Sequence, residues 1–225
     1  MRISKPSVPS PWARACAPAW LSLVLLALPG CALQPPSTPA DSAWQAELER
    51  WPASDALLLG EQHDAPEHQR WEADSVRWLA ERGRLAALVI EMAEAGTGTD
   101  GLPPDANAAQ VYAALRWNEA AWPWERYRAV VMAAVAAGVP VRGGNLPRSR
   151  MRAAMQDEAL DRHLPPAALA LQRNAIEEGH CGLLPADRVM PMVRIQLARD
   201  ASMAQVVQQA RQEGRTVLLA AGWGH

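Results

Sequence analysis

The chain has 225 residues, a formal net charge of −2 and 20% charged residues. Because its charge is near neutral and it carries no basic run, nucleic acid is not expected as a partner. Only Cys31 and Cys181 would remain after removal of an N-terminal leader, so no structural disulfide is expected.

Residues 1–30 have the pattern of a lipoprotein signal peptide. Basic residues precede a short apolar stretch at 20–28, which is too short to span a bilayer as a mature helix. A cysteine at the expected cleavage point predicts that Cys31 becomes the lipidated first residue. The alternative is an ordinary secretory peptide with an incidental cysteine. Residues 31–40 include the proline-rich stretch QPPSTP at 34–39 and are predicted to form a tether.

The remaining residues, 41–225, are predicted to form one α/β domain. In chain order we expect a helix at 41–50, a strand at 56–59, a helix at 68–81, a strand at 86–90, helices at 106–116 and 125–137, a strand at 139–141, a helical stretch at 149–178 broken at Pro165-Pro166, a helix at 186–212 and a strand at 215–220. This alternation predicts right-handed crossovers and a mainly parallel sheet flanked by helices in three layers.

Polar residues follow each of the four predicted strands. They are Glu61 and His63 after the first, Glu91 after the second, Asn145 and Arg148 after the third, and His225 after the fourth. Because parallel strands present their carboxyl ends at one edge of the sheet, we expect these side chains around one crevice. Carboxylate and imidazole groups together suit either metal ligation or general acid–base chemistry.

Each candidate also has an ordinary structural explanation. Glu61 is also suited to capping the next helix, and His63 to a polar turn. For Glu91 a functional role is favoured, because a carboxylate at the end of a buried strand is costly to bury without a partner. His180, beside a cysteine and between glycines, is either a reactive or metal-binding residue or a plain loop histidine. Asp200 lies within a long predicted helix and is equally explained by pairing with an arginine.

The chain has no C-x-x-C pair, P-loop, G-x-S-x-G elbow or H-E-x-x-H motif. The P-loop nucleotide-binding, serine-hydrolase and zincin classes therefore lack their usual support.

Six segments, taken in order, resemble the ChaN-type haem-binding lipoproteins. They are LLGEQHD at 58–64, IEM at 90–92, GNLPR at 144–148, HCG at 180–182, QLARDASMA at 196–204 and AGWGH at 221–225. The resemblance covers nearly all of residues 55–225. It implies an α/β domain that binds haem across a homodimer. It also implies a lipid anchor in the bacterial outer membrane, facing the periplasm, and a role in haem and iron acquisition.

The resemblance also implies site residues by position. The shared core would be Glu61, His63, Glu91 and His225, with Asn145, Arg148, His180 and Asp200 nearby. The distant kinship with TraB/Tiki and erythromycin-esterase-like proteins implies an alternative function. In it, the chain is a metal-dependent hydrolase with Glu61 or Glu91 as general base, and His63 and His225 hold a divalent metal or orient substrate. A third alternative is an interaction module with a vestigial cleft.

The haem iron requires a ligand such as His, Tyr, Met or Cys, and the resemblance leaves its identity open. Only two tyrosines occur, Tyr112 and Tyr127, both in predicted helices. Tyr127 follows a tryptophan cluster that either stacks on a porphyrin or packs in the core. Family members continue beyond the Gly-x-Gly-His segment with another strand and helix, so we expect a domain that is short at its C-terminal side.

Overall fold

The computed structural model describes residues 39–225, so the predicted signal peptide, Cys31 and most of the tether lie outside the described residues. The helices are α1 (Pro39–Arg50), α2 (Pro66–Glu81), α3 (Ala108–Ala114), α4 (Trp124–Ala136), α5 (Met151–Gln156), α6 (Pro166–Gly179) and α7 (Ala186–Ala210), with 3-10 turns η1 (Arg148–Arg150) and η2 (Glu158–Arg162). The strands are β1 (Ala56–Glu61), β2 (Leu85–Glu94), β3 (Val141–Asn145) and β4 (Thr216–Gly222).

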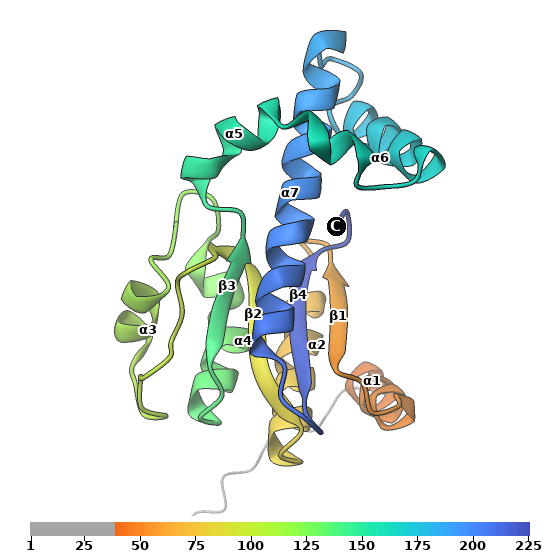
Figure 1. The fold of residues 1–225 in the computed structure, drawn as a ribbon. Coiled ribbons are helices and arrows are strands. Elements are labelled where there is room, and N and C mark those ends of the chain that lie inside the picture. Colours follow the sequence, from red (N-terminus) through yellow and green to blue (C-terminus); the bar gives the residue numbers. More distant parts are fainter. Residues whose placement is uncertain (1–38) are drawn as a thin grey trace, which may run out of the picture. The chain divides into compact units, whose positions relative to one another are not determined.

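The four strands form a parallel sheet in the order β1-β4-β2-β3 (Figure 1). The last strand in the chain therefore lies inside the sheet, paired with both β1 and β2. All seven residues of β4 are buried. This explains its continuous apolar run, because a parallel strand covered on both faces has no solvent-exposed side.

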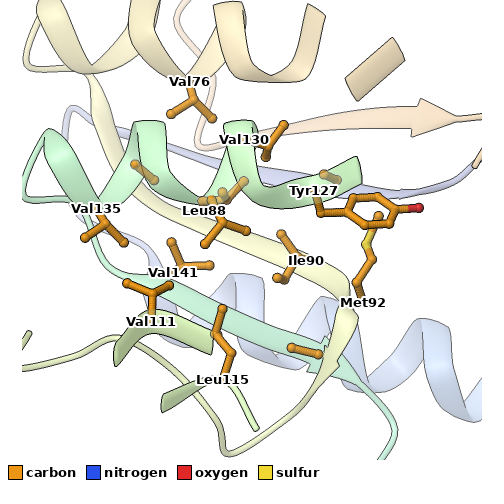
Figure 2. Packing of buried hydrophobic residues seen from close by; sticks show 14 of the residues in the cluster. Val76, Leu88, Ile90, Met92, Val111, Leu115, Tyr127, Val130, Val135 and Val141 are labelled. Carbon is orange, nitrogen blue, oxygen red and sulfur yellow. The ribbon is translucent and has the colours of Figure 1, made fainter. Parts of the chain in front are cut away.

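Helices cover both faces of the sheet, which confirms the predicted three-layer α/β fold. Side chains alternate between the faces along each strand. Leu88 and Ile90 of β2 belong to a core that includes residues of α2 and α4, while Val89 belongs to a second core with Met203 of α7. Figure 2 shows the first core, with Tyr127 of α4 beside Ile90.

Residues 151–179, here called the helical cap, lie beyond the carboxyl ends of the strands (Figure 1). The helical stretch predicted over 149–178 is broken at Pro165-Pro166 as expected, and its first part is divided further into η1, α5 and η2. The cap packs on the N-terminal half of α7 through a small core of its own, centred on Val193 and Leu197. Arg194 fixes it further by donating to both carboxylate oxygens of Asp161 at 2.7 Å. The cap therefore stands at the edge where the polar strand ends were predicted to meet.

The third strand differs most from its prediction. It was expected at 139–141 but runs over Val141–Asn145. Gly138 makes a turn with φ +69°, and Pro140 has no N–H for the sheet, so the strand starts only after both. Likewise β2 continues past the predicted end to Glu94, so Glu91 lies inside a strand.

The loop after β2 carries a G-x-G-x-x-G spacing at 96–101. The next helix, α3, starts only at Ala108, so the loop does not open a helix as a dinucleotide-binding loop does. No helix within residues 39–225 is both long and apolar enough to cross a membrane.

Candidate functional site

A cavity of about 630 Å³ lies at the carboxyl edge of the sheet. It is lined by residues of the strand ends, of the segment 116–122, and of η1, α5 and α7. Five of the predicted site residues line it, namely His63, Glu91, Asn145, Arg148 and His225. The predicted meeting of distant strand ends is therefore present in the fold.

Carboxylates and imidazoles alternate through this site in one continuous chain. Glu61 Oε1 lies 2.6 Å from His63 Nδ1, and His63 Nε2 lies 3.7 Å from Glu91 Oε2. Glu91 Oε1 lies 3.1 Å from His225 Nε2, and His225 Nδ1 lies 2.6 Å from Asp200 Oδ1. The predicted core residues and Asp200 thus share a single network, which can hold protons at two imidazoles between three carboxylates.

Glu91 is the centre of this network and is 4% exposed. Burial alone would raise its pKa, but hydrogen bonds from His225 and from the backbone N–H of Gly222 lower the pKa below the ordinary value. For His225, burial lowers the pKa, and the hydrogen bonds to Asp200 and Glu91 outweigh it and raise the pKa to about 9. The pKa of His63 is raised chiefly by its hydrogen bond to Glu61. The site therefore favours carboxylates facing imidazolium ions.

Glu61 is fully buried on the face covered by α2 and α4. Its carboxylate accepts hydrogen bonds from Tyr127 at 2.9 Å and from the side chain of Gln69. Glu72 of α2 is 2% exposed, and no donor among the described residues reaches its carboxyl oxygens. Burial and the charge of Glu61 raise the pKa of Glu72 to about 9. Glu72 therefore favours its neutral, protonated form.

Replacing Glu72 with glutamine should stabilise the protein at alkaline pH. The pKa of Glu72 is about 9 in the folded protein and about 4.5 in the unfolded chain. Above pH 4.5 the unfolded chain loses this proton while the folded protein keeps it, so the free energy of unfolding falls as pH rises toward 9. An amide mimics the protonated acid at every pH. We expect the Glu72→Gln protein to gain about 2–4 kcal/mol over wild type at pH 8 and nothing at pH 4, measured by urea unfolding. An equal difference at both pH values would contradict the assignment.

Four predicted residues do not line the cavity. Glu61 and Asp200 are linked to it through His63 and His225, whereas Tyr127 and His180 are separated from it. Tyr127 is buried behind Glu61, and its hydroxyl donates a hydrogen bond to that carboxylate. His180 ends α6, where its Nδ1 lies 2.7 Å from the carbonyl oxygen of Ile176, and it does not line the cavity. Their assignment as haem contacts stays a prediction, and neither position provides a direct contact with a ligand in the cavity.

The tryptophan cluster is divided between core and cavity. Trp117 and Trp124 are buried in the core. Trp122 lines the cavity, and its ring lies edge-on to that of His63 with the centroids 4.7 Å apart. Core packing therefore accounts for two of the three rings.

Several residues that line the cavity were missed by sequence reasoning. Arg116 and Arg199 add two cations to that of Arg148. The Nε atom of Arg199 and the Oδ1 atom of Asn145 are buried without a hydrogen-bond partner among the described residues. A buried donor and a buried acceptor of this kind are costly unless a ligand satisfies them. Arg199 lies inside the QLARDASMA segment, but nothing in that segment distinguishes it from a surface arginine.

The metal-dependent alternative has less geometric support. Within residues 39–225, no group of three or more His, Cys, Asp or Glu side chains is arranged to hold a metal ion. Both nitrogens of His225 face carboxylates, so this candidate ligand has no free lone pair in the observed arrangement.

Comparisons with known proteins agree with the fold. The family model described as haem-binding uptake, Tiki superfamily, ChaN, matches residues 48–225. A solved structure described as cofacial haem binding to ChaN of Campylobacter jejuni is similar, with a TM-score of 0.60 and 21% sequence identity. The similarity covers 80% of this chain and 73% of that chain. Comparison with curated proteins gives no significant match.

Proposed function

The chain belongs to the haem-binding uptake family (Tiki superfamily, ChaN), and on this premise we propose that it binds haem in the cavity at the carboxyl edge of the sheet. The observation that carries the proposal is the unsatisfied Nε atom of Arg199 in a cavity of about 630 Å³ that two further arginines also line. Arginine recognises carboxylates by charge-assisted hydrogen bonds, and haem carries two propionates on an apolar ring.

The rest of the lining suits the porphyrin body. Trp122, Leu146 and Met151 provide apolar and aromatic surface, as expected of a small-molecule pocket with a few placed polar groups. Bound haem would supply an iron centre with Lewis-acid and redox character. The chain's own residues bind the propionates, orient the ring and hold protons at His63 and His225.

A lipid anchor at Cys31 and a role in haem or iron acquisition at the cell envelope are part of the same proposal. Their support is the lipoprotein pattern of residues 1–31 and the uptake function in the family's description. A homodimer is also proposed. Its support is the cofacial haem binding of the similar Campylobacter jejuni protein, together with Trp223, whose side chain borders the cavity and is 79% exposed.

Replacing Arg199 with glutamine should weaken haem binding. The loss of one charge-assisted hydrogen bond corresponds to about a ten- to hundred-fold rise in Kd, measured by titration with haemin and followed at the Soret band. Arg173→Gln provides the matched control, because Arg173 is an exposed residue of α6 that does not line the cavity. Absence of a saturable Soret change in the wild-type protein would overturn the proposed function.

Replacing Cys31 with alanine should release the protein from membranes. If Cys31 carries the lipid, the variant loses its acyl chains and is expected in the soluble periplasmic fraction instead of the envelope. Fractionation with immunoblotting and labelling with radioactive palmitate measure this. Cys181→Ala is the control, since Cys181 is exposed in the loop after α6. Unchanged labelling of the Cys31→Ala protein would contradict the anchor.

A further inference from the structure

We infer that Arg116 is a specificity-determining residue of the cavity, which holds a second carboxylate of the ligand on the wall opposite Arg199. Both arginines line the cavity. This inference rests on the proposed function and deepens it, because it names the feature of haem that the cavity selects. A ligand with two carboxylates, as haem has in its two propionates, then binds more tightly than the same ligand with one.

Arg116 stands where glycine is the usual residue. It follows α3 with a φ of +48°, in the left-handed region that a side chain disfavours. The backbone N–H of Arg116 donates to the carbonyl of Ala113, and that of Trp117 donates to the carbonyl of Tyr112. These two hydrogen bonds define a Schellman turn, in which the left-handed residue is most often glycine.

The same turn ends two other helices with glycine. The left-handed residue is Gly83 after α2 and Gly138 after α4. Each of these glycines stands just before a strand, β2 or β3, at the amino edge of the sheet and away from the cavity. The local structure therefore favours glycine at position 116 as well. What the arginine adds is a cationic side chain at the cavity, and strained residues of this kind concentrate at functional sites.

Arg116 and Arg199 belong to opposite sides of the sheet. Leu115 and Trp117, the neighbours of Arg116, are buried in the core on the side of α4. Met203, one turn after Arg199 in α7, is buried in the core on the other side. The two arginines therefore reach the carboxyl edge of the sheet from different faces, and both line the cavity there.

The cavity keeps positive charge on both of these walls. Three arginines and two histidines line it against two glutamates, and Glu91, one of the two, is paired with both histidines. Within residues 39–225, the ion pairs of arginine with carboxylates involve neither Arg116 nor Arg199. Because arginine binds carboxylates through charge-assisted hydrogen bonds, two free guanidinium groups on facing walls suit a ligand with two carboxylates.

The test compares haemin with its monomethyl ester, in which one propionate is uncharged, as ligands of wild type and of Arg116→Gly. Wild type should bind haemin about five-fold more tightly than the ester, the upper range for an exposed ion pair, since Arg116 is exposed. Arg116→Gly should bind haemin about five-fold more weakly than wild type and should not distinguish the two ligands. Titration of the purified full chain at the Soret band measures all four dissociation constants.

Two further variants separate the carboxylate contact from the turn. Cys181, after α6, is the other non-glycine residue with positive φ among residues 39–225, in the same kind of turn, and it does not line the cavity. Both Arg116→Gly and Cys181→Gly should raise the melting temperature by about 2 °C, because each relieves a left-handed residue. Cys181→Gly should leave both dissociation constants unchanged. Arg116→Lys keeps the charge and should keep the preference for haemin.

The outcomes distinguish this inference from the proposed function. If wild type shows no saturable binding of haemin, the proposed function is wrong and the role of Arg116 falls with it. If wild type binds haemin, but does not prefer it to the ester or keeps that preference in Arg116→Gly, only the role of Arg116 is wrong. Equal weakening of haemin binding in Cys181→Gly would also overturn that role, because the effect would then come from the turn.

Discussion

Replacing Glu61 with alanine is expected to lower the free energy of unfolding by about 3–5 kcal/mol, the range for breaking a buried charged pair from one side. The Glu61 side chain is 1% exposed and is the common acceptor for Tyr127, Gln69 and His63. Alanine would leave these donors without their acceptor and would open a cavity beneath the sheet edge.

Urea unfolding monitored by circular dichroism measures this loss. The matched control is Glu213→Ala, at an exposed residue in the turn before β4, which should stay within about 0.5 kcal/mol of wild type. A Glu61→Ala protein within 1 kcal/mol of wild type would show that the buried network contributes little to stability.

Replacing Gly143 with alanine is expected to cost about 3 kcal/mol or more, the upper range for forcing extra atoms into a packed core. A Cβ at this position would lie 2.2 Å from the backbone oxygen of Glu94 and 2.7 Å from the hydroxyl of Thr97. The clash is with backbone, which cannot rotate away. Both segments are also fixed, because Gly143 donates its N–H to the carbonyl of Thr97 at 3.0 Å.

Gly179→Ala is the control for this substitution. A Cβ at Gly179, the last residue of α6, meets no atom within 4 Å, and alanine has the higher helix propensity. The control should therefore be as stable as wild type or slightly more so. Thermal unfolding of both variants measures the difference, and equal melting temperatures would contradict the close approach of β3 to the end of β2.

The sequence predicted β2 and β4 because these strands are buried on both faces. Their apolar runs are recognisable without a structure, since a covered parallel strand has no polar alternation. Strand ends were less well predicted. Glu91 was expected after its strand but lies within it, because the loop at Thr97 folds back on β3 and extends the pairing of β2 to Glu94.

The sequence by itself determined the α/β class, the order of the elements and the edge at which Glu61, His63, Glu91 and His225 meet. These follow from hydrophobic patterns and from the shared direction of parallel strands. Only the tertiary structure decided how the side chains pair. The burial of Glu72 beside Glu61, the position of Tyr127 behind the site and the place of His63 between Glu61 and Glu91 depend on which helix face packs on which strand. Such contacts join residues far apart in the chain, and no local pattern encodes them.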